Sequence, residues 1–239
     1  MRQVVRSRFL DFTGPLEGAA VASLYNDVRG MTTIAYGNLV NSVGAVIGLP
    51  FVWPDGRRAT TAEIASAWQA VHNDPQAAVR GWTYAARLTP LRLTPEGIAT
   101  LVTGRLESND RILLARLPEW ESYGACLQMA LHSLAWAAGA NAHFPRLFQA
   151  VTDRDFAAAA VQIHMNEYTP EGIHNAGLVP RNRANKILLR NAARVDAYHL
   201  DPDLLEWERD LGAPASEEPR QATVHVLSYP LGDPDPEAA

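Results

Sequence analysis

Two acidic residues near the amino terminus are of the type used in general acid–base chemistry. Glu17 and Asp27 are ten positions apart, and Gly30 and Thr33 follow them. Two carboxyl groups in different surroundings can hold one proton between them, with one group protonated and the other ionised. Such a pair can split a glycosidic bond, which needs a proton for the leaving oxygen and, in inverting enzymes, a water activated on the opposite sugar face.

The segment 27–39 must position the second carboxylate, and its composition predicts β-structure. It is rich in β-branched and aromatic residues, and Gly30 and Gly37 interrupt it as in a small hairpin or a short three-stranded sheet. Two or three strands are not stable alone in water, so helices must cover one face. We therefore expect a small α+β lobe beside a larger helical lobe, with a ligand cleft between them.

Most of the remaining chain is predicted to be helical. Thr60–Glu63 fits a capping box, and Thr94–Glu96 supplies a cap, a proline at the first helical position and an acid in the first turn. The run from Tyr123 to Ala138 is apolar on nearly every face, which indicates a helix that is buried all round. Helix-forming residues return from about Arg183 to Ala197. The predicted fold class is α+β and mainly helical.

Charge divides the chain into a body and a tail. Residues 1–200 contain 19 Lys and Arg against 16 Asp and Glu, a net +3, and residues 201–239 contain 2 against 10, a net −8, which together give −5. The tail is also rich in proline and is predicted to bury little, although 223–229 alternates enough for a short strand. We expect one domain over 1–200 and an acidic extension over 201–239. Within the domain, the small lobe is placed at about 12–60 and the helical lobe at 61–200.

Several classes of protein are excluded or disfavoured by simple counts. The single cysteine, Cys126, rules out a framework of intrachain disulfides. No run of about 18 apolar residues appears, so no transmembrane helix is expected. The first residues carry charge with no apolar stretch behind them, so we expect no secretory signal.

Two blocks of residues resemble the phage-type lysozymes. The first block consists of Glu17-Gly18, Tyr25-Asn26-Asp27, Gly30 and Thr33–Leu39. The second block, about 150 residues later, consists of Pro180–Lys186 followed by Asp196-Ala197-Tyr198. Residues 128–139 and 155–160, between the blocks, are similar to the central helical lobe of that family. The resemblance covers roughly residues 5–198 and implies a lysozyme-like bilobal fold.

The resemblance implies a role for each residue of the constellation. It identifies Glu17 as the general acid and Asp27 as the ionised partner that orients water. Thr33 would hold that water through its hydroxyl group, and Arg183 occupies the position of an arginine that pairs with the acid. Ten positions separate the two acids where the family usually has nine, so Asp11 is the alternative acid.

Three further residues are candidates to line a saccharide cleft. Tyr36 and Asn38 belong to the first block, in which Ala35 replaces a glycine of the family pattern. Trp53 lies in the loop 49–56 and could offer its ring to a sugar.

The resemblance implies a muramidase that hydrolyses the β-1,4 bond between N-acetylmuramic acid and N-acetylglucosamine, with inversion and with no metal or organic cofactor. Its expected partners are peptidoglycan glycan strands and, for a secreted antibacterial effector, an immunity or inhibitor protein. Nucleic acid and membranes are not expected partners, and a monomer is the expected state. We expect cytoplasmic synthesis and delivery to the periplasm or cell wall through a lysis pore or a secretion machine. Both a phage or prophage lysis enzyme and an effector fit this expectation.

Two other functions remain open from the sequence. One is a lytic transglycosylase or a chitin or chitosan hydrolase. Transglycosylases form anhydro ends without a water-orienting carboxylate, so Asp27 and Thr33 weigh against that reaction. The other is a lysozyme-like protein that binds glycan without turnover, which the additional residue between Glu17 and Asp27 would allow.

Overall fold

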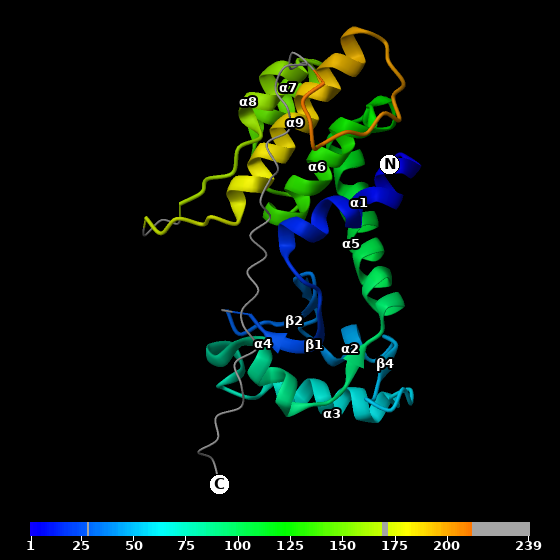
Figure 1. Ribbon diagram of the computed structural model, residues 1–239, viewed down its shortest axis with the longest axis vertical. Coiled ribbons are helices and arrows are strands. Elements are labelled where there is room, and N and C mark those ends of the chain that lie inside the picture. Colours follow the sequence, from blue (N-terminus) through cyan, green and yellow to red (C-terminus); the bar gives the residue numbers. More distant parts are fainter. Residues whose placement is uncertain (28, 169–171, 212–239) are drawn as a thin grey trace.

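The computed structural model describes residues 1–27, 29–168 and 172–211. The chain is α+β and mainly helical, as the sequence predicts. Its buried apolar residues form two separate clusters. We call residues 18–101 the sheet region and α1 together with residues 102–211 the helical region (Figure 1).

The sheet region contains a three-stranded sheet, but the segment 27–39 predicted to form a hairpin or such a sheet supplies only its hairpin, β2 and β3, because β1 lies before residue 27. The strands are antiparallel in the order β1-β2-β3, and a second pair joins β4 to β5. The elements are β1 (Val21–Asn26), β2 (Thr32–Ala35), β3 (Asn38–Leu39), α2 (Val43–Val46), β4 (Phe51–Val52), α3 (Thr61–His72), α4 (Ala77–Leu88) and β5 (Arg92–Leu93).

Helices cover one face of this sheet, as a short sheet requires. Asn26 Nδ2 donates to the carbonyl of Val71 at 2.9 Å, and Thr32 Oγ1 lies 2.9 Å from His72 Nδ1. Tyr25 pairs with Thr33 across β1 and β2. Directly paired residues present their side chains on the same face of a sheet, so Tyr25 and Thr33 share the face opposite Asn26 and Thr32.

The helical region is built around α6 (Ala125–Ala138), which is buried almost all round and ends before Gly139, where φ is +91°. This matches the prediction for 123–138. Helix α6 packs against α1, α5 and α9. Over the residues that the structure describes, no helix is both long and apolar enough to cross a membrane. The other elements are α1 (Gln3–Glu17), α5 (Pro95–Arg116), η1 (Trp120–Ser122), α7 (Pro145–Thr152), α8 (Phe156–Gln162) and α9 (Leu178–Ala197).

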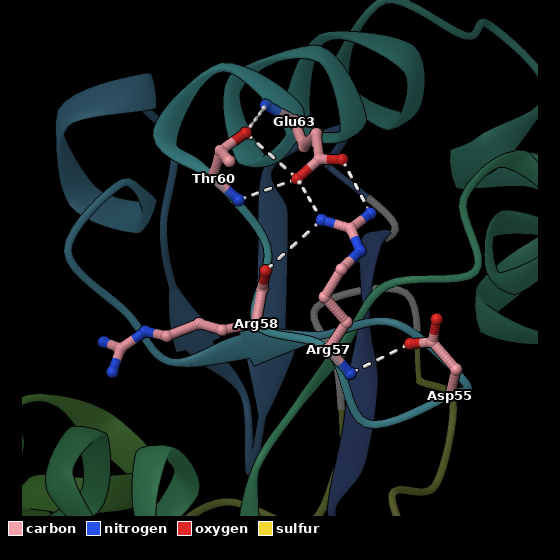
Figure 2. A network of polar contacts seen from close by, with 5 residues as sticks. All are labelled: Asp55, Arg57, Arg58, Thr60 and Glu63. Atoms are coloured by element: carbon pink, nitrogen blue, oxygen red, sulfur yellow. Dashed lines mark hydrogen bonds and ion pairs between the residues drawn. The ribbon is translucent and has the colours of Figure 1, made fainter.

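The predicted helix caps are confirmed. Glu63 N–H donates to Thr60 Oγ1 at 3.3 Å, and the Glu63 carboxylate accepts from Thr60 N–H at 2.7 Å, which completes a capping box. Figure 2 shows Arg57 placed against the same carboxylate. Thr94 caps α5 by accepting from the N–H of Gly97 at 3.1 Å, with Pro95 in the first turn.

The predicted boundary between the lobes is wrong. Helix α1 packs in the helical region through Phe9 and Phe12. Helices α3 and α4, which lie within 61–88, belong to the sheet region because Ile64, Val71 and Ala85 share a core with the sheet. A three-stranded sheet needs these helices to bury one face, so they cannot belong to the other region.

The predicted boundary at residue 201 is also wrong for the part of the extension that is described. The carbonyl of Pro202 accepts from Ala125 N–H at 2.7 Å. Asn191 Nδ2 donates to the carbonyls of Glu206 and Arg209, and the Trp207 ring packs edge-on against Phe12. Residues 201–211 are therefore part of the folded body. The rest of the extension, with the strand predicted at 223–229, lies outside the described residues.

Candidate functional site

A cavity of about 370 Å³ lies where the two regions meet. Glu17, the last residue of α1, faces it, and its side chain is 26% exposed. The helix ends here because Gly18, with φ of +81°, takes a left-handed conformation that favours glycine. The walls include Tyr36 and Gly37 from the turn between β2 and β3, Arg105 from α5, Trp136 from α6 and Arg181 from α9.

Arg181 is the ion-pair partner of Glu17. Its guanidinium is only 2% exposed, pairs with the Glu17 carboxylate and donates to Ser133 Oγ at 3.1 Å and to the Ser133 carbonyl at 3.3 Å. The assignment of this role to Arg183 is wrong, because Arg183 is exposed. Two residues turn an α-helix by about 200°, so Arg181 and Arg183 point to nearly opposite sides of α9.

Burial raises the pKa of Glu17, and this effect outweighs the opposing charges of Arg181 and Arg105. The residue also lies at the carboxyl end of α1, where the helix dipole disfavours an anion. The carboxyl group therefore keeps its proton to a higher pH than an exposed glutamate does. This is the property required of a proton donor near neutral pH.

Asp27 directly follows β1 and organises the turn that leads to β2. Its Oδ1 accepts from the backbone N–H groups of Arg29 and Met31, both at 2.9 Å. The residue is half-buried, and no donor among the described residues bonds to its Oδ2. Asp27 is thus a turn residue, and it also has an oxygen left over for another partner.

Thr33 is held close to Asp27 through Met31. The N–H of Met31 donates to Asp27 Oδ1, and the carbonyl of Met31 accepts from Thr33 Oγ1 at 2.9 Å. Thr33 is 4% exposed, and its hydroxyl oxygen still has lone pairs that can accept a hydrogen bond. Asp27 and Thr33, two of the three predicted catalytic residues, therefore meet at the backbone of one residue, Met31, but neither is among the residues that line the Glu17 cavity.

Tyr25 interacts electrostatically with both Glu17 and Asp27, and no role was predicted for it from the sequence. Burial raises the pKa of Tyr25, and the negative charges of Asp27 and Glu17 raise it further. Tyr25 therefore lies within electrostatic reach of both carboxylates, on the same face of the sheet as Thr33. Its place directly opposite Thr33 could be found only after the strand register was known.

The structure treats the cleft candidates differently. Tyr36 lines the cavity, as predicted. Asn38 is buried, and its Nδ2 donates to the Leu101 carbonyl at 3.3 Å, so it ties β3 to α5 and does not line the cavity. Trp53 is also absent from the cavity wall and packs on the sheet-region core, with the Arg57 guanidinium 5.1 Å from its ring centre.

The alternative acid, Asp11, is exposed and pairs with Arg8 on the same helix at 3.0 Å. It does not line the cavity. Glu17 is therefore the acidic side chain of α1 that the structure places at the junction of the two regions.

Comparisons of this chain with protein-family models, with curated proteins and with solved structures find no match. In the described part of the chain, no group of three or more His, Cys, Asp or Glu side chains is placed to hold a metal ion. Any conclusion about function therefore depends on the residues of the cavity and on the motifs that contain them.

Proposed function

We propose that this chain is a muramidase with a lysozyme-like bilobal fold, which hydrolyses the β-1,4 bond between N-acetylmuramic acid and N-acetylglucosamine in peptidoglycan. The observation that carries the proposal is the Glu17 carboxyl group, whose pKa is raised by burial in a cavity between two regions of the protein. The sheet region supplies a second carboxylate, Asp27, in different surroundings: it is bonded to the backbone of its own turn and is not among the residues that line this cavity.

In this proposal Glu17 donates its proton to the glycosidic oxygen as the bond to the sugar breaks. Asp27 Oδ2 takes a proton from the attacking water, which approaches the opposite face of the sugar ring. Thr33 donates its own proton to the Met31 carbonyl, so its oxygen can only accept a hydrogen bond from that water. The water is thereby oriented by two acceptors, and inversion at the anomeric carbon follows from attack opposite the leaving group.

The turn between β2 and β3 supports the resemblance on which the proposal draws. The family pattern has glycine at the positions of Ala35 and Gly37, and both residues have positive φ here, +57° and +73°. A left-handed conformation favours glycine and costs an alanine about 1 kcal/mol. Ala35 therefore occupies a position with the backbone geometry that the family pattern requires.

The test is hydrolysis of purified peptidoglycan by the wild type, Glu17→Gln and Asp11→Asn, with mass spectrometry of the products. Loss of a general acid is expected to lower the rate about 10³-fold in Glu17→Gln. Asp11→Asn is the matched control, because Asp11 is exposed on the same helix, and it should keep wild-type activity.

Each alternative has its own result in this experiment. Equal rates for the wild type and Glu17→Gln would contradict the assignment of Glu17. Anhydromuramic ends would indicate a transglycosylase, and products from chitin or chitosan in place of peptidoglycan would indicate a different hydrolase. Binding of glycan without any products would indicate a non-catalytic protein.

A further inference from the structure

Arg105 is a second arginine in the cavity, and the reaction proposed above does not use it. It lies near the middle of α5, the long helix that runs from the sheet region into the helical region (Figure 1). Its Nη2 donates to the Trp136 carbonyl of α6 at 2.6 Å, and its Nη1 donates to the Gly37 carbonyl at 3.4 Å. The guanidinium carbon also stacks 4.0 Å from the centre of the Trp136 ring. One planar group therefore contacts both regions.

Among the described residues, the contact to Gly37 is one of two hydrogen bonds that join the β2–β3 hairpin to α5. One helical turn before Arg105, the Leu101 carbonyl accepts from Asn38 Nδ2 at 3.3 Å. The strands on either side of this turn are paired, with Thr33 opposite Leu39. Moving the turn would therefore move Thr33, and with it the Met31 peptide that binds Asp27.

Arg105 also interacts electrostatically with Glu17, the proposed acid, which lines the same cavity. Among the described residues, the charged or titratable groups around Glu17 are Arg181 from α9, Arg105 from α5, Tyr25 from β1 and Tyr36 from the β2–β3 turn. Arg181 and Arg105 lower the pKa of Glu17 against the larger effect of burial. Arg181 makes the direct ion pair, so Arg105 acts on the carboxylate across the cavity.

We propose that Arg105 is a positioning residue that holds the sheet carrying Asp27 and Thr33 at a fixed place relative to Glu17, through its contacts to Gly37 and Trp136 in the cavity that Arg105 and Glu17 both line. The catalytic meaning of this proposal rests on the proposed function. The contact and the charge effect belong to the free protein and can be measured without substrate.

Arg116 provides a matched control on the same helix. Its guanidinium stacks 3.6 Å from the ring centre of Phe148 and donates to the carbonyls of Ala140 and Ala142. It thus makes the same kinds of contact as Arg105, but it is outside the Glu17 cavity. Arg116→Gln should show what the loss of such a half-buried arginine does to stability alone.

The first measurement is an NMR titration of the Glu17 side-chain carboxyl carbon in the free protein, with the resonance assigned by its absence in Glu17→Gln. In Arg105→Gln the pKa of Glu17 should rise, by less than the about 1–3 units expected for loss of a cation in direct contact. Arg105→Lys keeps the charge and should leave that pKa near its wild-type value. Arg116→Gln should also leave it unchanged.

The second measurement is the pH profile of peptidoglycan hydrolysis. Arg105→Gln should lower kcat and shift the alkaline limb upward, because the acid keeps its proton to a higher pH. Lysine cannot reproduce the planar contacts to two carbonyls and a ring, so Arg105→Lys should lower kcat about 10-fold without shifting that limb.

The proposal is overturned if the pKa of Glu17 is the same in Arg105→Gln and the wild type, or if Arg116→Gln shifts it equally. Wild-type kcat in Arg105→Lys would also overturn it, because the contacts of the guanidinium would then not be needed to position Asp27 and Thr33. A wild-type protein without hydrolytic activity, in which Arg105→Gln still shifts the pKa of Glu17, would contradict the proposed function and leave the role of Arg105 in place.

Discussion

Two glutamate–arginine pairs in this chain have opposite electrostatic outcomes. Glu63, in the first turn of α3 in the sheet region, pairs with Arg57 at 2.8 Å and also accepts from Thr60 (Figure 2). These hydrogen bonds, above all the one from Arg57, lower the pKa of Glu63 to about 2. Glu17, the last residue of α1, pairs with Arg181, yet burial raises its pKa.

The difference teaches that an arginine partner alone does not decide the state of a carboxyl group. The Glu63 carboxylate is in contact with solvent at the amino end of a helix, where the dipole and the backbone N–H groups favour an anion. The Glu17 side chain is about as exposed as that of Glu63, 26% against 30%, but it lies at the carboxyl end of a helix, where the dipole disfavours an anion, and its partner Arg181 is 2% exposed against 51% for Arg57. The first glutamate is therefore a structural anion, and the second has the property of a proton donor.

The largest expected difference between the pairs is in stability when the arginine is removed. Arg181→Met should lower the free energy of unfolding by about 3 kcal/mol, because Arg181 is the buried member of its pair and its loss leaves Glu17 and Ser133 without their partner. Arg57→Met should cost much less, since Arg57 is exposed and its pair with Glu63 is screened by water. Urea unfolding at neutral pH measures both values. Equal losses would mean that burial does not distinguish the pairs.

The second expected effect concerns the capping box at the start of α3, in which Thr60 bonds to Glu63. Thr60→Ala removes the side-chain acceptor of the Glu63 N–H and should cost about 1 kcal/mol, as measured by thermal or urea unfolding. Thr60→Ser keeps the acceptor and serves as the control. Neither change touches the Glu17 cavity, so both variants should hydrolyse peptidoglycan at the wild-type rate. A loss of activity in Thr60→Ala but not in Thr60→Ser would contradict this expectation, because it would mean that the cap of α3 affects the Glu17 cavity.

The same contrast explains which parts of the molecule could be predicted from the sequence. The capping box at Thr60 and the buried helix α6 depend on residues within one or two turns, so local patterns predict them correctly. The ion pair of Glu17 joins residues 164 positions apart, and its geometry depends on how α9 is rotated against α6. The resemblance identified the correct helix, α9, but it assigned the ion pair to Arg183, two residues after Arg181.

A signal for the correct arginine was present in α9. Its buried side chains include Arg181, Asn185, Leu188 and Ala192, with the three- and four-residue spacing of one helix face. Arg183 falls outside that spacing. Trp53 and the boundary at residue 201 had no such local signal, because Trp53 packs on the sheet-region core and 201–211 pack on α1, α6 and α9.

The smallest expected effect separates the two glutamates by the direction of their pH dependence. The folded-state pKa of Glu63 is lowered, so above its unfolded-state pKa of about 4.5 the ionised group stabilises the protein, and this contribution is lost as the pH falls toward 2. The folded-state pKa of Glu17 is raised, so its contribution is fully present below pH 4.5 and is lost as the pH rises through the folded-state value.

The difference in unfolding free energy between the wild type and Glu63→Gln should therefore grow with rising pH between about 2 and 4.5. The corresponding difference for Glu17→Gln should shrink with rising pH above about 4.5. Urea unfolding across pH 3–7 gives both slopes, and slopes of the same sign would mean that the two carboxyl groups share one environment in spite of their opposite places on a helix.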